Sequence, residues 1–440
     1  APEMLRFVAT RTPIRFELLS EPDPFAEAEG GKSKGRMLSP LPLSPRILGR
    51  LGRSIRSSTV THLFTYQELI DLNPYNRPIA AGIRAFARLL RRWLTGERGQ
   101  GTALIAGLVR GCLDAGVTFK LDSRATRLVQ NADGRITGVE LETRGVPVTV
   151  GARRGVVIAS GGFEWNAELR ERHFPGWLDL IGTPRANEGD GQKMAAAAGA
   201  LLDHMDQANI YPCLPTRYEG QRNGLPAQFQ AAAHAIVVNR DAKRFCAEGH
   251  YNIGEALDAR GPNGEPVNLP CYLIADSRFL GNSRPFRWYS SYEPGWVRKA
   301  STIAGLATQL GLPAGELEAT VDRWNEFCRL GRDADFARGE NTWENYKAGG
   351  SFRLRPIDTP PFVGMSFNRS FIGTKGGART NEHGQVLRPD GSVIPGLYAA
   401  GLAMANPFGT RTIGSGTTIG PNMTWGYIAA ETIARQAHDE

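Results

Sequence analysis

The chain has 440 residues, 41% of them hydrophobic, so it can bury a large core and is long enough for two or more domains. Its formal net charge of +8 is spread along the whole sequence, which favours an anionic small ligand or a mildly basic surface over a nucleic-acid track. The five cysteines are scattered and never form a CxxC pair, so we expect no disulfide framework, no metal site and a reducing, cytoplasmic setting.

The first hundred residues carry two contrasting segments. Residues 23–45 are rich in Pro, Gly, Ser and Lys, which predicts an extended, exposed stretch. Residues 78–94 place bulky apolar side chains at helical spacing, with arginines on the other faces. The apolar positions are Ile79, Ile83, Phe86, Leu90, Trp93 and Leu94. This amphipathic basic helix either packs on its own domain or contacts a membrane surface, and no run in the sequence is apolar enough to span a membrane.

From residue 101 the pattern becomes α/β. Residues 102–115 are predicted to form a helix, residues 117–121 a strand, and residues 126–141 a hairpin that turns at an Asp-Gly pair. Residues 154–160 then form a continuous apolar strand. Alternating elements of this kind indicate an α/β fold with a parallel sheet.

Two glycine turns follow that apolar strand. Gly161 and Gly162 come directly after it, and ligands in open α/β sheets gather at the carboxyl ends of strands. The pair therefore indicates a cofactor edge, with an ordinary tight turn as the alternative. Asp190 lies in a GDG turn that leads into an alanine-rich helix, where it serves either as a helix cap or as a ligand to a ribose hydroxyl.

The middle region, roughly residues 201–364, has a different character, with three of the seven histidines and many aromatic residues. Arg244, Glu248, His250 and Tyr251 lie close together in sequence, and such crowding of titratable groups suits proton transfer. The alternative is structural: Arg244 and Glu248 are four residues apart, as in a helical ion pair, and Tyr251 would belong to the core.

A strand, a glycine-dense loop and a helix are predicted for residues 396–436. Gly401 lets the backbone turn after the strand, and Gly414 and Gly416 remove side chains that would keep a flat ligand away. Pro421 stands where the first helical residue is expected, so the free amides and the dipole of the helix face the loop. We therefore predict a cradle for an electron-rich oxygen or ring nitrogen.

Six motifs, in this order and over nearly the whole chain, resemble the flavoproteins of the fumarate reductase and 3-ketosteroid 1-dehydrogenase group. They are VVIASGGF, GDG, VVNRDAKRF with its following Glu and Tyr, DADFARG, GTKGGARTNEHGQVL, and the closing GLYAAG with GTRTIGSGTTIGPNMTWGYIAA. The resemblance implies FAD as cofactor. It also implies an α/β fold in which a Rossmann-like FAD-binding domain of the glutathione-reductase type carries an inserted α+β substrate or catalytic domain. We expect the FAD-binding domain at 1–205 and 365–440, and the inserted domain at 206–364.

The family's opening GxGxxG unit has no match at any strand-to-helix junction of this sequence. The family's order places it before Ala1, so we expect the FAD-binding domain to be incomplete at its amino terminus. The missing unit would then be absent or supplied by another polypeptide. This expectation supports a third reading, a non-catalytic subunit or fragment that contributes half of a flavin site.

The resemblance also implies roles for individual residues. Tyr251 matches a tyrosine that removes a proton next to a ketone while a hydride passes to flavin N5. Gly416 would polarise the ketone through its N–H, and Thr412 stands where the family has a second tyrosine. The expected cofactor-binding residues are Gly161, Gly162, Asp190, Gly401, Leu402, Gly416, Thr417, Thr418, Ile419 and Asn422.

Two substrates fit this chemistry. A steroid-like ketone would be desaturated next to its carbonyl, and the aromatic middle region favours such a larger apolar substrate. A small unsaturated acid would instead be reduced as in fumarate reductase, with Arg244, His250 and Arg411 as carboxylate-binding residues. We expect no nucleic-acid partner. Besides the substrate, the possible partners are a membrane surface, an amino-terminal polypeptide and a second copy of the chain.

Overall fold

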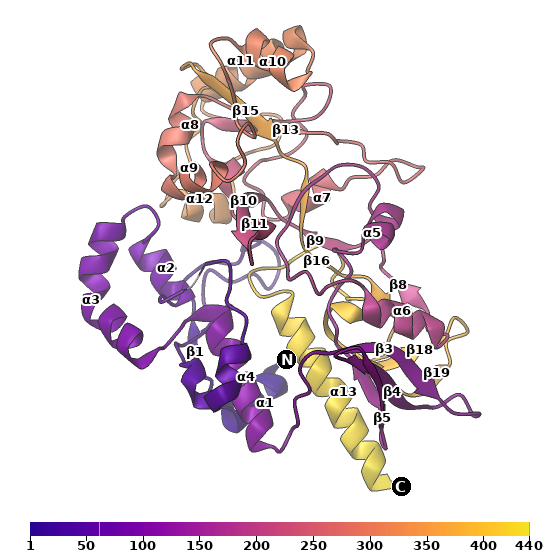
Figure 1. The fold of residues 1–440 in the computed structure, drawn as a ribbon. Helices are drawn as coiled ribbons and strands as arrows, with labels where there is room; N and C mark the ends of the chain where they lie inside the picture. Colours follow the sequence, from indigo (N-terminus) through magenta and orange to yellow (C-terminus); the bar gives the residue numbers. More distant parts are fainter. Residues whose placement is uncertain (61, 440) are drawn as a thin grey trace.

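The computed structural model describes residues 1–60 and 62–439. Figure 1 shows a lower body formed by both ends of the chain and an upper body formed by its middle. The amino-terminal helix α1 (Pro2–Arg11) lies against the long carboxyl-terminal helix α13 (Ile419–Asp439), so the first and last helices of the chain pack together. The arrangement is the α/β fold with an inserted α+β unit that the sequence predicts. The boundaries at residues 206 and 364 stay predictions.

Two three-stranded sheets build the right side of the lower body in Figure 1. Their strands are β3 (Ser123–Gln130), β4 (Ile136–Thr143) and β5 (Val146–Gly151) in one sheet, and β18 (Gln385–Leu387), β19 (Val393–Ala399) and β6 (Val156–Ile158) in the other. In the second sheet β6 and β19 run parallel, with Ile158 opposite Ala399. Met194 of helix α6 (Asp190–Ala197) packs into the same apolar core as Ile158. The predicted hairpin and parallel strand are therefore present.

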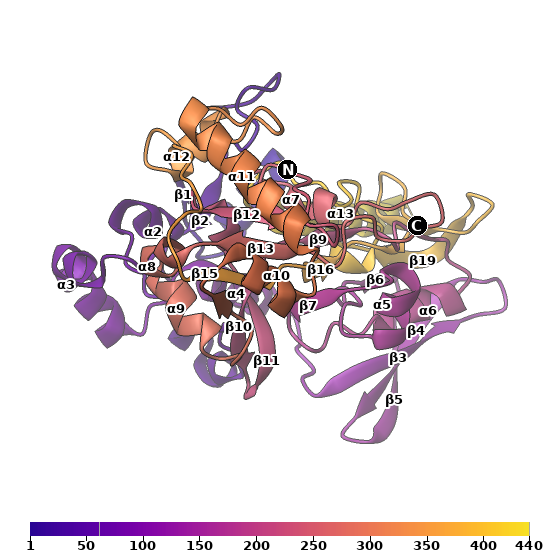
Figure 2. The same ribbon diagram turned by 90° about the horizontal axis from the view of Figure 1, so that it is seen from above.

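The upper body is a four-stranded antiparallel sheet with helices on both faces. Its strands, in spatial order, are β12 (Ala235–Val238), β13 (Tyr272–Ala275), β15 (Phe362–Ser366) and β14 (Arg298–Ala300). Side chains alternate across a sheet, so Ile236 packs with Trp324 while Val237 packs with Phe286 on the opposite face. The helices are α7 (Ile253–Leu257), α8 (Ser277–Asn282), α9 (Arg284–Ser290), α10 (Ile303–Leu310), α11 (Ala314–Leu330) and α12 (Thr342–Lys347). Figure 2 shows α10 and α11 over one face.

Between the two bodies lies a mixed sheet of β7 (Leu178–Ile181), β16 (Arg369–Thr374) and β9 (Ala208–Ile210). The chain passes from β15 into β16 within two residues, so the upper sheet leads directly into the lower body. The remaining short elements are α5 (Ala167–His173), β8 (Leu202–Asp203), β10 (Cys213–Tyr218), β11 (Gln221–Pro226) and β17 (Gly377–Ala378).

The amino-terminal region forms the left side of Figure 1. It contains β1 (Phe16–Leu18), β2 (Leu38–Pro40), a short 3₁₀ helix (Pro45–Ser54), α2 (Tyr66–Leu72), α3 (Pro78–Thr95) and α4 (Gln100–Asp114). Two predictions fail here. Residues 117–121 form no strand, because no neighbouring strand pairs with them and Val117, Phe119 and Leu121 are exposed. Residues 23–45 are not exposed throughout, since Asp23 and Pro24 are buried.

Candidate functional site

The carboxyl ends of β6 and β19 meet at one edge, as the sequence predicts for the glycine turns there. Gly161 follows β6, and Gly401 and Leu402 follow β19. A single side chain joins these turns: Nε2 of buried Gln192 donates to the carbonyl oxygens of Gly161 at 3.2 Å, Leu402 at 3.1 Å and Gly376 at 3.2 Å. Gln192 lies in the alanine-rich helix two residues after Asp190, and no local sequence signal predicts its role.

Gly162 has a packing role at this edge. A Cβ on Gly162 would lie 2.3 Å from Oε2 of Glu164 and 2.3 Å from Oγ1 of Thr374. Its carbonyl accepts a hydrogen bond from the Gly189 N–H at 3.1 Å, which connects it to the GDG turn. Any larger residue at position 162 would collide with the side chains of Glu164 and Thr374.

The predicted cradle loop lies between β19 and α13, and one hydroxyl holds its shape. Thr417 Oγ1 accepts from the N–H groups of Ile413 and Gly414, each at 3.1 Å, and donates to the Gly414 carbonyl at 2.6 Å. Gly416 has φ +92°, and a Cβ there would meet nothing within 4 Å. Across the described residues the Gly416 N–H has no acceptor, so it is free to bind a ligand oxygen.

Two buried acceptors border this loop without donors. Asn422 Oδ1 and Gln192 Oε1 have no hydrogen-bond partner among residues 1–60 and 62–439. Both side chains lie at the turn after β19, because a Cβ on Gly401 would be 3.8 Å from Asn422 Cγ and Gln192 binds the Leu402 carbonyl. Buried acceptors need donors, and the N–H and hydroxyl groups of a flavin nucleotide are of that kind. The residues present therefore fit FAD.

The other two predicted ring contacts also belong to this region. Thr418 Oγ1 accepts from Asn209 Nδ2 at 3.3 Å, which connects the loop to β9. The side chain of Ile419 is about half exposed at the start of α13. Residues 416–422 thus form one continuous surface that begins at the loop and ends on the first turn of the helix.

Asp190 lies farther along the lower body. Its carboxylate accepts from Arg124 Nε at 2.8 Å and from a terminal guanidinium nitrogen of Arg124 at 2.7 Å. Both side chains line a surface cavity of about 520 Å³ between β3 and α6. A ribose hydroxyl bound by Asp190 would have to share the carboxylate with Arg124, and the cofactor role of Asp190 stays a prediction.

A buried lysine lies beneath the cradle loop. Lys375 has no exposed surface, and its Nζ donates to the Arg411 carbonyl at 3.3 Å. Burial lowers the pKa of Lys375 to about 8. Lys375 belongs to the GTKGG segment, one of the six motifs of the resemblance, and its hydrogen bond connects this segment to the cradle loop.

Tyr251 lies beside the cradle loop because its neighbour Asn252 is bonded to Thr412. Asn252 Oδ1 accepts from the Thr412 N–H at 3.1 Å and from its hydroxyl at 2.8 Å, and Nδ2 donates to the Thr412 carbonyl at 3.2 Å. The ring of Tyr251 packs edge-on against Trp343, with centroids 5.1 Å apart, and against Phe25. Burial raises the pKa of Tyr251 to about 12.

Two further tyrosines that the sequence analysis missed belong to this site. Burial first, and then Glu21, raises the pKa of Tyr66 to about 12, while the Ser415 hydroxyl opposes the rise. Ser415 acts in the same way on Tyr251, and the pKa of Tyr211 is raised by burial and by the two other tyrosines. Tyr66 and Tyr251, which come from distant segments, thus share Ser415 of the loop as a neighbour, and Tyr211 lies next to these two phenols. Tyr66 begins α2 behind a Thr65 cap, a local signal of a helix start but not of function.

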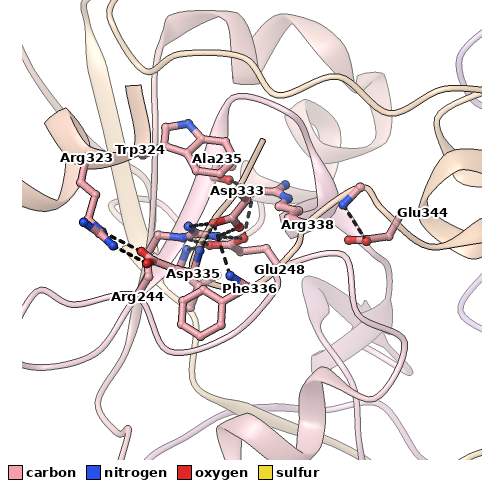
Figure 3. Close-up of polar contacts among 12 residues, drawn as sticks. Ala235, Arg244, Glu248, Arg323, Trp324, Asp333, Asp335, Phe336, Arg338 and Glu344 are labelled. Carbon is pink, nitrogen blue, oxygen red and sulfur yellow. Dashed lines mark hydrogen bonds and ion pairs between the residues drawn. The ribbon is translucent and has the colours of Figure 1, made fainter. Parts of the chain in front are cut away.

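Arg244, predicted to bind substrate, lies in a buried ion-pair network (Figure 3). It forms hydrogen bonds of 2.8 to 3.1 Å with both carboxylate oxygens of Glu248 and of Asp333. Arg338 also binds Glu248, at 3.0 Å, and Trp324 covers the Arg244 guanidinium at 4.7 Å. Arg244 therefore has the structural role that the sequence analysis gave as the alternative, an ion pair with Glu248, and its guanidinium lies in the core of the upper body.

The other two predicted substrate residues also do not offer a free positive charge. Arg411 has a side chain that is 81% exposed and pairs with Glu255. His250 packs against Phe25, and burial lowers the pKa of its imidazole, which keeps it neutral near pH 7. The three residues therefore do not form one cationic pocket.

A glycine-lined cradle at a parallel strand edge, with a helix start on one side and buried phenols on the other, is the arrangement of a flavin-dependent oxidoreductase. The comparisons with known proteins agree. Residues 2–419 match the family model described as the FAD binding domain. The chain belongs to this family of FAD-binding flavoproteins and is an FAD-dependent oxidoreductase acting on carbon–carbon bonds.

Individual relatives are similar over almost the whole chain. The 3-oxosteroid 1-dehydrogenase of Mycobacterium tuberculosis (strain ATCC 25618 / H37Rv) is 36% identical, over 99% of this chain and 83% of its own length. The 4-oxocyclohexanecarboxylate 2-dehydrogenase of Sinomonas cyclohexanicum is 32% identical, over 99% and 77%. The crystal structure of 3-ketosteroid delta1-dehydrogenase from Sterolibacterium denitrificans in complex with 1,4-androstadiene-3,17-dione superposes with a TM-score of 0.85, at 28% identity, over 99% of this chain and 84% of that one.

Proposed function

We propose that the protein desaturates the carbon–carbon bond next to the carbonyl of a cyclic, steroid-like ketone. The observation that carries this proposal is the pair of buried phenols of Tyr251 and Tyr66 at Ser415, with Tyr211 next to them, close in the chain to the Gly416 N–H, which has no acceptor among the described residues. Phenols and a backbone amide suit a neutral ketone, because one group can take a proton while the other stabilises the developing enolate oxygen. The names of the relatives, which include dehydrogenases of oxosteroids and of oxocyclohexane carboxylates, support the same substrate class.

In this proposal each group of the chain has a defined task. Tyr251 takes the proton from the carbon next to the carbonyl. The Gly416 N–H binds the carbonyl oxygen, and the dipole of α13 stabilises negative charge at the same end of the helix. Thr412 holds the loop through Asn252, so its hydroxyl reaches substrate only when it leaves that partner. The glycine turns and the cradle loop would hold FAD, which would supply the hydride acceptor for the adjacent carbon.

Reduction of a small unsaturated acid is less well supported. That reaction needs cations aimed at carboxylates. Arg244 has both of its carboxylate partners in the core, Arg411 is paired at the surface, and His250 is neutral. None of these three predicted cations offers a free positive charge, so we favour the ketone.

The experiment has two stages. Purified protein is first titrated with FAD, and a resolved flavin absorption spectrum is expected. If no flavin binds, the chain works only with a further polypeptide and the proposal fails for the chain alone. The loaded protein is then assayed with an artificial electron acceptor on a 3-oxosteroid and on 4-oxocyclohexanecarboxylate, and with a reduced dye on fumarate. Turnover of a ketone without fumarate reduction is expected, and the reverse result would refute the proposal.

We also propose that helix α3 rests on an anionic lipid surface. None of the helices that the structure describes is long and apolar enough to cross a bilayer. Six bulky apolar side chains of α3, those at the positions predicted for its apolar face, are nevertheless between 44 and 77% exposed, while Ala81 and Ala85 are buried. Figures 1 and 2 both place α3 at the outer edge of the molecule.

The charges of α3 support a negatively charged lipid surface, although Arg88 pairs with Glu68 and Arg91 with Glu97. The helix contains Arg84, Arg88, Arg91 and Arg92 and no acidic residue. Arg84 is exposed, whereas Arg92 is buried on Glu68. An apolar stripe that includes a tryptophan and has arginine beside it fits the interface of a membrane with negatively charged headgroups. An apolar ketone that dissolves in the bilayer would then be close to the enzyme.

A further inference from the structure

Glu21 is a buried carboxylate with one unused oxygen. Its side chain has no exposed surface, and its Oε1 accepts a hydrogen bond from Lys347 Nζ at 2.5 Å. Its Oε2 has no hydrogen-bond partner within residues 1–60 and 62–439. A buried carboxylate oxygen without a donor is costly, so its retention here calls for a reason.

Geometry connects this carboxylate to three buried phenols, those of Tyr66, Tyr211 and Tyr251, which we call the phenol cluster: its partner Lys347 lies over Trp343, and Trp343 packs against Tyr251. The negative charge of Glu21 raises the pKa of Tyr66, Tyr211 and Tyr251, in each case after the larger effect of burial. The same charge acts on Tyr346, which lies next to Lys347 in α12. These phenols come from α2, from the residue after β9 and from the segment just before α7, while Lys347, the cation paired with Glu21, comes from α12.

Lys347 connects this carboxylate to the solvent. Its side chain is 35% exposed, and its Nζ also lies 4.5 Å from the centroid of Trp343, the ring that packs on Tyr251. The segment that begins at Glu21 and the helix α12 therefore enclose the phenols on one side. Water has access to the outer end of Lys347 but not to Glu21.

A phenol that acts as the base in this site has a proton to dispose of. Tyrosine with a pKa near 12 is protonated at neutral pH, so Tyr251 can take a proton only if it gives up its own at the same time. A carboxylate is a good acceptor for that proton, and a lysine at the surface can exchange it with water.

We propose that Glu21 and Lys347 form the proton exit of the site. This inference rests on the proposed function. As the carbon–hydrogen bond next to the carbonyl breaks, its proton goes to the Tyr251 oxygen, and the former hydroxyl proton of Tyr251 passes through Ser415 and Tyr66 to Glu21 Oε2. The Lys347 ammonium first gives one proton to water and then receives the proton from Glu21. One proton reaches the solvent in each turnover, while the hydride leaves separately, and every residue returns to its starting state.

Glu21→Gln distinguishes this proton exit from a purely electrostatic role of Glu21, because the two roles predict opposite changes in the rate. Glu21→Gln removes a negative charge, which must lower the pKa of the nearby tyrosines and increase their phenolate form. If Glu21 acted only through its field, the variant would be the faster enzyme near neutral pH. If Glu21 carries the proton, the variant is slower although its tyrosines ionise more easily.

The test compares wild type, Glu21→Gln, Glu21→Asp and Glu27→Gln, each loaded with FAD. Glu27 is the matched control, since it lies on the same segment and accepts a hydrogen bond from the Thr342 N–H of α12 at 2.6 Å, outside the phenol cluster. Thermal unfolding and the flavin spectrum establish that each variant is folded. Ultraviolet titration of the tyrosines, which needs no turnover, should show a lower phenolate midpoint in Glu21→Gln.

We expect Glu21→Gln to lower kcat about 100-fold with little change in KM, and Glu21→Asp to restore at least about a tenth of the activity. The solvent deuterium isotope effect on kcat should grow in Glu21→Gln and stay at the wild-type value in Glu27→Gln. Wild-type turnover with an equal or higher kcat in Glu21→Gln would overturn the proton exit alone. A wild type that turns over no ketone would overturn the proposed function together with the exit.

Discussion

Asn252 and Thr412, 160 residues apart, are joined by three hydrogen bonds, which use both polar atoms of the Asn252 amide. Asn252 directly follows Tyr251, and Thr412 opens the cradle loop. The phenol that we propose as the base and the amide that we propose as the oxyanion donor are therefore held by one side chain.

Replacement of Asn252 should separate these two groups. Asn252→Ala removes three hydrogen bonds, each worth about 1 kcal/mol, and should reduce kcat more than tenfold because the base no longer has a fixed position. Asn268→Ala is the control, since Asn268 also donates to a backbone carbonyl, that of Ala256 at 2.8 Å, away from the loop. Steady-state kinetics and thermal unfolding of both variants test the prediction. Equal kinetic losses in the two variants would contradict it.

Loss of the Tyr251 hydroxyl should affect the chemical step alone. Tyr251→Phe keeps the ring that packs on Trp343, so FAD binding and the melting temperature should stay at wild-type values. The value of kcat should fall by about 10² to 10⁴, the range typical of general acid–base groups. Rapid-mixing measurement of flavin reduction by substrate gives the rate directly. A variant with normal flavin reduction would remove Tyr251 from the proposed mechanism.

Arg244 should prove to be a stability residue. Arg244→Met leaves Glu248 and Asp333 buried without their shared cation, which should cost about 3 to 5 kcal/mol of unfolding free energy. Arg411→Met removes only an exposed pair and should cost less than about 1 kcal/mol. Denaturant unfolding distinguishes the two variants. A selective rise in KM at unchanged stability in Arg244→Met would restore the substrate-binding prediction.

Lys375 should make stability depend on pH. Its folded pKa of about 8 lies below its ordinary 10.5, so the unfolded chain binds the proton more tightly and stability rises as pH increases from about 8. Below that range the buried cation costs about 3 kcal/mol. Lys375→Met should therefore be more stable at pH 7, and the difference from wild type should shrink by pH 9.5. Urea unfolding of the flavin-free proteins at both pH values measures this difference, and a constant difference would contradict the expected titration.

The lipid contact of α3 can be tested with vesicles. The double variant Phe86→Ser with Trp93→Ser should lose cosedimentation with vesicles of phosphatidylglycerol and phosphatidylcholine. Binding of the wild type should weaken in high salt because arginine attracts the headgroups. Trp177→Ser is the control, since Trp177 is 57% exposed and lies directly before β7, not on α3. Binding that persists in the double variant would refute the contact, and a dimer that dissociates in the double variant would assign the face to a second copy instead.

Local sequence signals predicted the fold better than they predicted the site. The apolar strand before Gly161 and the glycine loop around Gly416 have a strong local pattern, and the structure contains both. Tyr66, Tyr211 and Gln192 have no such pattern, because their roles arise only when distant segments meet. Arg244 had the right spacing for a partner at Glu248, but its second partner, Asp333, is 89 residues away. The predicted strand at 117–121 failed because a strand requires a neighbour.

The three hydrogen bonds of Gln192 have a consequence for assembly. Because one side chain from a helix fixes the turns after β6 and β19 and the segment after β16, the shape of the cradle is set by the folded polypeptide and not by its guest. Little ordering entropy is then lost when the cofactor enters. Without flavin the binding site would keep its shape, and the cofactor could exchange without unfolding of the protein.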